Sequence, residues 1–492
     1  MARGRRARRP PVPLALSVII GATLLSVAPA TADDVPTLRV FAAQSQLTVE
    51  RDRHGFVYLD PGMWIKSVGG DFELRVARTD YESPITLTQV DSETGVVLRA
   101  LPVEMLDGFY GLKDFVRVKV LDADGKQVFG YPMPFCPNSW YQQRLSDDAP
   151  LVSHYPYWCG GGPLTRGAVW GIDDGWAAAL IGGYYYGLGW EADRKHYTIR
   201  MTVDPAWADL LGIADEDTVA QVHVIAVDRG TLGAASTPAE PAAPVYTPGP
   251  AVPDVTDPPV VSLPDLYALP AWSMGAYRHK GRDLLGFNAT EWNEGPGTFV
   301  IEGFRGPDEP KMNAYQYFIV DGEPVGRTQI GELEFHLGGG HNHWHFEEFT
   351  EYTLLDASKT EVLVSGKQSW CLVNTDAVDL TVPNANWQGY GQDLSTSCGG
   401  PSALWIREVL DVGWGDTYSQ YVSGQAFDIT DLPNGRYYVR VHVNPTGSIL
   451  EASTANNVQD RLIRLKGGLG HRRVVVPPWN GIDTESYCYY CG

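Results

Sequence analysis

The stretch PNGRYYVRVHV, residues 433–443, shows most directly how this chain folds. After a Pro-Asn-Gly turn, Tyr437, Val439, Val441 and Val443 alternate with more polar neighbours. Successive side chains of a β-strand point to opposite faces, so an alternating segment can bury one face and expose the other. We therefore predict a half-buried β-strand that begins directly after the turn.

The same alternation recurs far from this stretch. Two segments nearer the N-terminus show it, namely Phe72, Leu74 and Val76, and then Val116, Val118 and Val120. The second ends near Asp124-Gly125, a dipeptide typical of hairpin turns. No long segment carries the 3.6-residue apolar period of an amphipathic helix. We predict an all-β chain of two β-sandwich-like domains.

A proline-rich linker is expected between these domains. Ten of the 33 residues from Pro238 to Pro270 are proline, which fixes φ and has no amide hydrogen to donate, so such a stretch runs extended. The predicted boundaries are an N-terminal β-sandwich domain of unknown role at 33–234, the linker at 235–262, a second domain at 263–468, and a C-terminal tail with a C-x-x-C sequence at 469–492.

Residues 1–32 have the features of a signal peptide. Five arginines precede an apolar run from Leu14 to Val27, and the small-residue site Ala30-Thr31-Ala32 follows. The run is shorter than the roughly 20 residues that span a bilayer. We predict a secreted, extracellular protein with no membrane span after signal removal. An uncleaved N-terminal anchor is the alternative.

The charge balance excludes one class of partner. The formal net charge is −21, and removal of the five signal-peptide arginines gives −21 − 5 = −26. Nucleic-acid binding requires clustered Lys and Arg, so we expect no nucleic-acid partner. A negative field attracts cationic substrates, although an acidic surface also simply keeps an exported protein in solution.

Six cysteines in an exported chain indicate disulfide bonds. Six thiols allow 15 pairings, and sequence alone does not select among them. Proximity along the chain favours the pairs Cys136–Cys159 and Cys371–Cys398. Cys488 and Cys491 then remain, and we expect them to form a structural bridge.

A histidine cluster is the first sign of chemistry. His341, His343 and His345 have the i, i+2, i+4 spacing that places side chains on one face of a strand, roughly 6.5–7 Å apart. Imidazoles at this spacing can lean toward a common metal ion, and they suit copper, zinc, iron or nickel, with Cu(II) leading in affinity. The alternative is a set of histidines on a solvated strand face. His336 is a further candidate ligand whose direction is left undetermined by Gly338-Gly339-Gly340.

Four segments around and after this cluster resemble the lysyl oxidase family. They are 341–356, with HNHWH, Glu348-Phe349, Tyr352 and Leu354-Leu355-Asp356; GKQSWCL at 366–372; Asp416-Thr417-Tyr418 with FDITD at 427–431; and Asn444-Pro445 with Asn456-Asn457. The resemblance covers about 200 residues, from near Leu263 to about Gly468. The N-terminal domain shares none of it.

The resemblance implies that the second domain is a lysyl oxidase-type catalytic domain. His341, His343 and His345 then bind Cu²⁺, while Lys367 and Tyr418 form the cofactor lysine tyrosylquinone. Their order and spacing, 22 residues from His345 to Lys367 and 51 more to Tyr418, agree with this. The implied reaction oxidises primary amines, with peptidyl lysine as the expected substrate, to aldehydes. Molecular oxygen is the acceptor, and ammonia and hydrogen peroxide are released.

The sequence also departs from the family. Glu351 and Gly366 stand where animal members carry histidines, which leaves the general base unassigned, and most family cysteines are absent. The alternative function is a non-enzymatic extracellular copper-binding or adhesion protein. The presence of both Lys367 and Tyr418 argues against it, since metal capture needs neither. A zinc hydrolase is disfavoured because the sequence has no H-E-x-x-H spacing.

Overall fold

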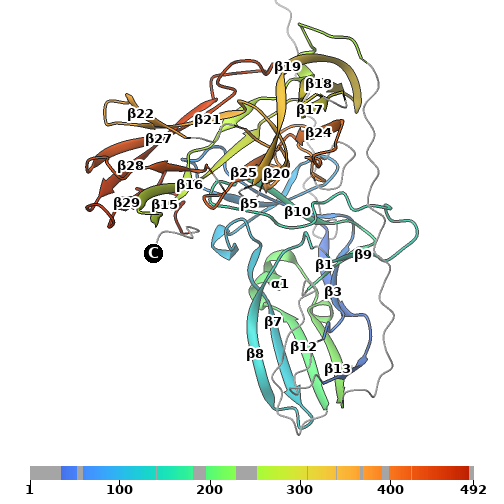
Figure 1. Ribbon diagram of the computed structural model, residues 1–492. Coiled ribbons are helices and arrows are strands. Elements are labelled where there is room, and N and C mark those ends of the chain that lie inside the picture. Colours follow the sequence, from blue (N-terminus) through green and yellow to red (C-terminus); the bar gives the residue numbers. More distant parts are fainter. Residues whose placement is uncertain are drawn as a thin grey trace, which may run out of the picture. The chain divides into compact units, whose positions relative to one another are not determined.

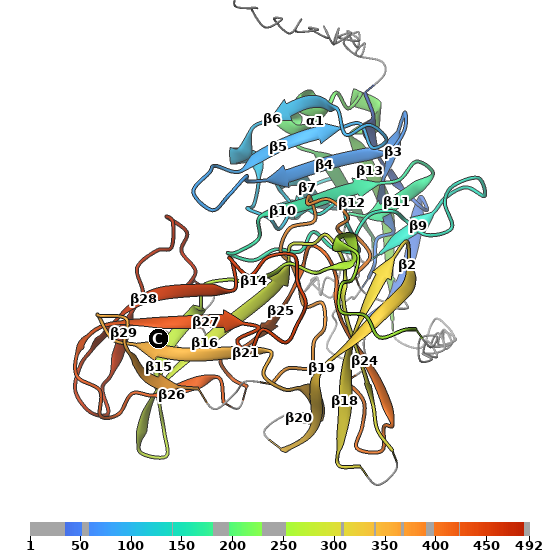
Figure 2. The ribbon, with the colours of Figure 1, turned by 90° about the horizontal axis from the view of Figure 1, so that it is seen from above.

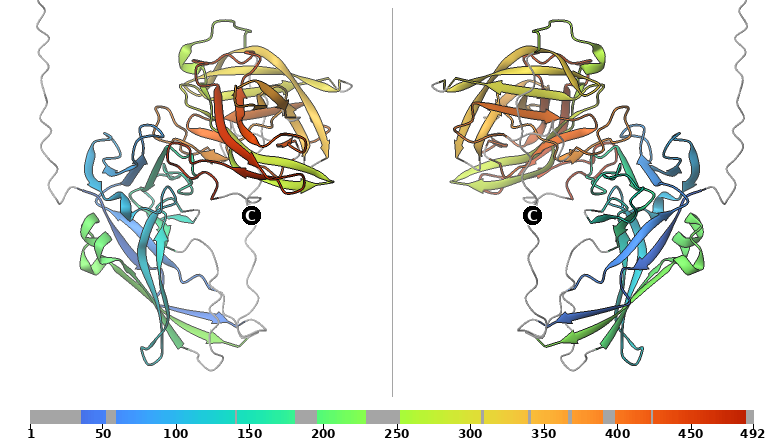
Figure 3. Two further views of the ribbon diagram at one scale, coloured as in Figure 1. Left: turned by 90° about the vertical axis from the view of Figure 1, so that its left-hand side faces the viewer. Right: turned by 90° about the vertical axis from the view of Figure 1, so that its right-hand side faces the viewer.

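Strands make up nearly all of the regular structure (Figure 1). The computed structural model describes residues 35–51, 59–139, 141–180, 196–228, 252–306, 309–338, 341–365, 369–389, 398–422 and 424–486. Residues 36–492 form one compact unit. The predicted all-β class is confirmed, and Figure 3 shows the predominance of strands from two sides. The division into two domains and its boundaries stay predictions, and the signal segment and Cys488 and Cys491 lie outside the described residues.

The described chain up to residue 228 forms three sheets. In order across each sheet, the strands are β1 (Thr37–Ala42), β3 (Met63–Val68), β11 (Trp176–Ala179) and β9 (Gln142–Arg144); β10 (Gly167–Ile172), β4 (Phe72–Ala77), β5 (Thr86–Val90) and β6 (Val97–Leu101); and β2 (Gln46–Glu50), β13 (Val219–Val227), β12 (His196–Val203), β7 (Leu112–Asp122) and β8 (Gln127–Phe135). The alternating segments at 72–76 and 116–120 are strands β4 and β7, as predicted. Their apolar side chains lie in one core.

The described chain from residue 252 onward forms three further sheets. The strands are β14 (Leu266–Ala268), β16 (Arg282–Asn293), β25 (Trp414–Tyr418) and β23 (Asp376–Ala377), with β15 (Trp272–His279) and β26 (Ala426–Asp428) also paired to β16; β20 (His341–Phe346), β19 (Glu323–Gly338), β18 (Lys311–Val320), β17 (Phe299–Phe304) and β24 (Trp405–Leu410); and β22 (Glu361–Val364), β21 (Thr350–Leu355), β27 (Gly435–Val443), β28 (Val458–Lys466) and β29 (Arg473–Val475). Figure 2 shows β21, β27 and β28 side by side. Strand β27 confirms the prediction for residues 433–443, and Val439, Val441 and Val443 are fully buried in a second core.

Helical structure is confined to short segments of the described chain: α1 (Pro205–Leu211) and the 3₁₀ turns η2 (Val103–Met105), η3 (Asp215–Asp217) and η4 (Val260–Ser262). Asp204 caps α1 by accepting a hydrogen bond from the amide of Ala206, and Gly212, at φ 67°, ends it in the left-handed conformation. No helix in the described ranges has the length and apolar character needed to cross a membrane.

Arg166 joins the N-terminal sheets to the C-terminal ones. Its guanidinium lies 2.6 Å from a carboxylate oxygen of Asp379 and 2.6 Å from one of Glu294, and it stacks over the ring of Trp292. The next residue, Gly167, forms a backbone bridge to Asp379, and a Cβ there would lie 2.2 Å from an oxygen of that carboxylate. Only glycine fits such a close approach. The loop around Asp379 is therefore held by the N-terminal part of the chain.

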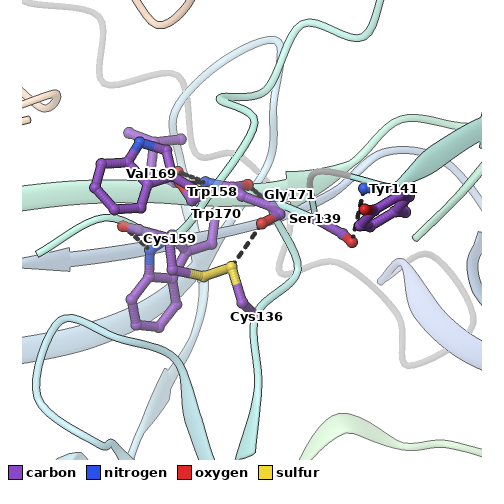
Figure 4. Close-up of a disulfide and its surroundings, with 9 residues drawn as sticks. Cys136, Ser139, Tyr141, Trp158, Cys159, Val169, Trp170 and Gly171 are labelled. Carbon is purple, nitrogen blue, oxygen red and sulfur yellow. Dashed lines mark hydrogen bonds between the residues drawn. A yellow bond between two sulfur atoms is a disulfide. The ribbon is translucent and has the colours of Figure 1, made fainter. Parts of the chain in front are cut away.

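The two disulfides that proximity favoured are both present. Cys136 bonds Cys159, and Cys371 bonds Cys398. In the first, shown in Figure 4, the indole of buried Trp170 donates to the carbonyl of Cys159 at 3.1 Å. This bridge fixes a loop of the N-terminal core, while the second lies in the candidate site described next.

Candidate functional site

The histidine cluster lies on strand β20, as its spacing predicts. β20 pairs antiparallel with β19, and His343 has His336 as its cross-strand neighbour. The rings of His343 and His345 have centroids 4.8 Å apart, and His345 is fully buried. The side chain of His341 lies outside the described part of the chain, although its backbone is in β20.

His336 joins this cluster, which the sequence left undetermined. Its ring centroid lies 4.4 Å from that of His345, and its Nε2 is 3.3 Å from a carboxylate oxygen of Glu347. The antiparallel hairpin of β19 and β20 explains the approach, because cross-strand neighbours project from the same face. Three imidazoles therefore gather on one face of this hairpin.

The donor set fits a transition metal. Nδ1 of His345 lies 3.1 Å from the hydroxyl of Ser369. Nε2 of His336 lies 3.3 Å from a carboxylate oxygen of Glu347. A histidine ring held by a hydrogen bond through one nitrogen presents the other nitrogen to a metal ion. Clustered imidazoles suit copper and zinc alike. The residues present thus agree with the expected metal site, and the ligand set itself stays a prediction.

Residues 369–372 connect the histidine strand to the strand of Tyr418. The backbones of Trp370 and Phe346 exchange hydrogen bonds of 2.6 and 3.0 Å, which attaches the segment to the end of β20. The amide of Cys371 donates to the hydroxyl of Tyr418 at 2.9 Å. Residues 369–372 thus contact both the histidine strand β20 and the strand of Tyr418, β25. This segment begins two residues after Lys367 in the sequence. Lys367 itself lies outside the described residues.

Tyr418 is held firmly at the end of β25. Its ring centroid lies 4.1 Å from that of Trp370, and the planes are tilted by 48°. Burial, followed by the negative charge of Asp416, raises the pKa of the Tyr418 hydroxyl. The phenol therefore stays protonated at neutral pH unless a nearby group accepts its proton.

Three buried carboxyl groups surround this end of β25, and the sequence motifs gave a functional role to none of them. Glu291 on β16 is the cross-strand neighbour of Asp416, and Glu408 comes from β24. All three are at most 2% exposed. One oxygen of Glu291 lies 3.4 Å from the hydroxyl of Tyr352, and one of Glu408 accepts from the amide of Leu372 at 3.0 Å. Within the described chain neither Glu291 nor Glu408 forms an ion pair.

Protonation follows from this burial. Burial, with the charge of Asp416 adding to it, raises the pKa of Glu291 well above its usual value. Burial also raises the pKa of Glu408, against the opposing hydrogen bond from Leu372. An unpaired carboxylate is costly in a low-dielectric interior, so such groups are held in the protonated form. The site therefore stores protons close to Tyr418.

Glu351 does not join the site. It alternates with Thr350 and Tyr352, which are buried, and its carboxylate accepts from the hydroxyl of Thr353 at 3.3 Å. Its cross-strand neighbour is His442 on β27. This position agrees with a partly solvated strand glutamate on the opposite face of β21 to buried Thr350 and Tyr352.

Known proteins resemble the region that holds this site. Residues 323–471 match the family model for lysyl oxidase. The C-terminal region is lysyl oxidase-like. The chain is 35% identical over 120 residues to lysyl oxidase homolog 1 of Homo sapiens, covering 24% of this chain and 18% of the relative. It is 33% identical over 129 residues to protein-lysine 6-oxidase of Sus scrofa, covering 26% and 45%.

A third relative gives the same picture. Lysyl oxidase homolog 2 of Gallus gallus is 30% identical over 128 residues, which cover 26% of this chain and 15% of the relative. The chain thus spans less than half the length of these lysyl oxidase relatives. The predicted confinement of the resemblance to the C-terminal region is confirmed.

Replacing Ser369 with Ala is expected to weaken metal binding. The hydroxyl is the group that orients His345, and loss of such a partner typically lowers metal affinity about 10- to 100-fold. A competition titration with Cu²⁺ and a chromophoric chelator measures the change. Ser402→Ala, at an exposed position, is the matched control. Equal affinities for the two variants would show that His345 binds no metal or needs no orientation by Ser369.

Proposed function

We propose that this chain is a secreted, copper-dependent amine oxidase of the lysyl oxidase type. Its substrates are primary amines, above all lysine side chains of peptides and proteins. Each turnover converts one amine, one O₂ and one water into an aldehyde, ammonia and hydrogen peroxide. The names of the relatives, protein-lysine 6-oxidase among them, support this substrate class.

One observation carries the proposal. Ser369 lies 3.1 Å from Nδ1 of the predicted ligand His345, and the amide of Cys371 donates to the hydroxyl of the predicted cofactor tyrosine, Tyr418. These contacts support a single site for metal and cofactor. A protein that only captures copper does not need a tyrosine held in this way. Lys367, two residues before Ser369 in the sequence, is the proposed second half of the cofactor.

The residues of the site have separate proposed roles in metal binding, cofactor formation and positioning. His341, His343 and His345 would hold copper, which supplies oxidation of the Tyr418 ring to a quinone that Lys367 crosslinks to give lysine tyrosylquinone. Trp370 fixes the plane of the tyrosine ring through its contact at 4.1 Å, and the amide of Cys371 fixes its oxygen. Positioning of this kind keeps reacting groups aligned before the chemistry starts.

The side chains of Glu291 and Glu408 carry protons within the site. Deprotonation of the Tyr418 hydroxyl needs an acceptor, and amine oxidation releases a proton from the substrate carbon. Asp416, Glu408 and Glu291 act electrostatically on that hydroxyl, in decreasing order. We propose that this carboxyl cluster, rather than Glu351, exchanges protons with the site. Glu291 and Glu408 are held protonated and donate protons. Asp416, whose negative charge acts most strongly on the Tyr418 hydroxyl, accepts one.

Peptide mass mapping of the copper-reconstituted, aerobic protein tests the proposal, with Lys367→Ala as the control. We expect a crosslinked pair of peptides that joins Lys367 to Tyr418 and is absent in the variant. Unlinked, unmodified peptides under full copper loading would refute the oxidase and leave an extracellular copper-binding protein as the better description.

A further inference from the structure

A cleft of about 290 Å³ lies where the N-terminal and C-terminal parts of the chain meet. The N-terminal part contributes Tyr110 and residues 161–163, and the C-terminal part contributes Trp272, Asp376 and Tyr421 among others. Tyr421 follows Tyr418 by three residues. At the lower limit of the roughly 300–1,000 Å³ of typical ligand pockets, this cleft has room for a single extended side chain.

Asp376 is the charged group of the cleft. Its Oδ2 accepts a hydrogen bond from the hydroxyl of Thr375 at 2.8 Å, and the hydroxyl of Thr417 donates to it as well. It has no ion-pair partner in the described part of the chain. Burial raises its pKa against these two hydrogen bonds. A cation that entered the cleft would relieve this cost by pairing with the carboxylate.

A chain of hydrogen bonds connects the aromatic wall to this carboxylate. The indole of Trp272 donates to the hydroxyl of Thr290 at 3.1 Å, and the hydroxyls of Thr290 and Thr417 lie 2.6 Å apart. Either hydroxyl of this pair can be the donor. Trp272, Thr290 and Thr417 thus form a connected polar chain beside Asp376, and connected hydrogen bonds strengthen one another. The cleft is a preorganised acceptor of positive charge.

Aromatic rings line the mouth of the cleft. Tyr110 is 43% exposed and Tyr421 is 74% exposed, and Trp272, which also lines the cleft, is half-buried. Aromatic faces attract ammonium groups and pack on the methylene chain that carries them. A cleft lined by one acidic group and several aromatic rings is complementary to a lysine side chain.

The cleft is separate from the site at Tyr418. Residues of a strand alternate between its two faces, so Thr417 projects from the opposite face of β25 to Asp416 and Tyr418. Thr417 belongs to the hydrogen-bond chain of the cleft, and Asp416 lies opposite Glu291 in the carboxyl cluster. The two sites thus lie on the two faces of one sheet and adjoin at Thr375, whose hydroxyl lies 2.8 Å from Asp376 and 3.3 Å from Asp416.

We propose that this cleft is a second subsite that binds a lysine side chain of a polypeptide substrate while another lysine is oxidised. The identity of the substrate rests on the proposed function, but binding does not. A polypeptide with several lysines is then favoured over a small amine. The N-terminal part of the chain acquires a role in substrate selection, since it supplies one wall of the cleft.

Calorimetric titration of copper-free, full-length protein with an acetylated, amidated pentalysine peptide tests this inference. We expect Asp376→Asn and Tyr421→Ala each to weaken binding about tenfold, the size of one lost charged or aromatic contact. Asp321→Asn makes the same charge change at an exposed turn and is expected to leave binding unaltered. The peptide with every lysine Nε-acetylated is expected not to bind.

Kinetics separate a failure of the cleft from a failure of the oxidase. With copper restored, Tyr421→Ala is expected to raise the KM for the peptide about tenfold and to leave its kcat and all constants for butylamine unchanged. Tyr421 is largely exposed, so this variant keeps the test valid if Asp376→Asn folds poorly. Unaltered peptide affinity in Tyr421→Ala and Asp376→Asn, or no binding by the parent protein, overturns the subsite. If the parent protein oxidises no amine but the variants still bind the peptide more weakly than the parent does, only the proposed oxidase is overturned.

Discussion

Replacing Tyr418 with Phe is expected to abolish amine oxidation while the protein remains folded. Phenylalanine keeps the ring beside Trp370 but lacks the oxygen from which a quinone is made. The cost in stability is modest. The amide of Cys371 loses its acceptor, and a buried donor left unsatisfied costs about 1–3 kcal/mol.

Two measurements together test this result. Peroxide release with a primary amine reports activity, and urea unfolding reports stability. Tyr438→Phe, which changes a tyrosine on β27 in a different sheet, is the matched control and is expected to retain activity. Turnover by Tyr418→Phe at the parent rate would remove Tyr418 from the reaction and with it the proposed cofactor.

The second large effect concerns pH. Because the pKa of Glu291 is raised in the folded state, the folded protein keeps a proton that an unfolded glutamate releases above about pH 4.3. Its stability contribution is complete below that pH and is lost as the pH rises toward the folded-state pKa. The free energy of unfolding then falls by about 1.4 kcal/mol per pH unit for each such group.

Replacing Glu291 with Gln should remove the contribution of this one group to the pH dependence of the free energy of unfolding. Glutamine resembles the protonated acid, does not titrate, and can still accept the hydrogen bond from Tyr352. Urea unfolding at pH 5 and pH 7 should therefore show the variant gaining stability relative to the parent as the pH rises, at up to about 1.4 kcal/mol per pH unit. Glu323→Gln at an exposed position should show no gain. If the free energy of unfolding changed with pH equally in the parent protein and in Glu291→Gln, Glu291 would be ionised in the folded state.

The sequence predicts local structure well because period-two alternation is a property of neighbouring residues. It identified β4, β7 and β27, and it placed His341, His343 and His345 on one strand. Proximity along the chain likewise selected the two disulfides. In each case the interacting residues are close in sequence or belong to one strand.

The carboxyl cluster could not be predicted from local sequence patterns. Glu291, Glu408 and Asp416 come from three strands, and only the pairing of β16 with β25 and the position of β24 bring them together. No local pattern encodes such pairing. A glutamate such as Glu408, placed beside the buried run of Val409 and Leu410, is the one signal that was available. His336 was undetermined for a similar reason, because its direction depends on the hairpin with β20.

The contacts of the N-terminal part of the chain could not be predicted from its sequence. Nothing in its composition indicated that Arg166 pairs with Asp379 and Glu294, more than a hundred residues away. The cleft at Asp376 was invisible for the same reason. Both features depend on surfaces that meet only after each sheet has formed.

The hydrogen bond between Cys371 and Tyr418 has a consequence for the lifetime of the protein. It brings together two segments that are 47 residues apart, and it exists only in the folded chain. A covalent link between positions 367 and 418 would make this proximity permanent and would restrict the unfolded chain as a disulfide does. Each molecule that completes the proposed modification would become harder to unfold, so catalytic maturation and durability outside the cell would be acquired in the same event.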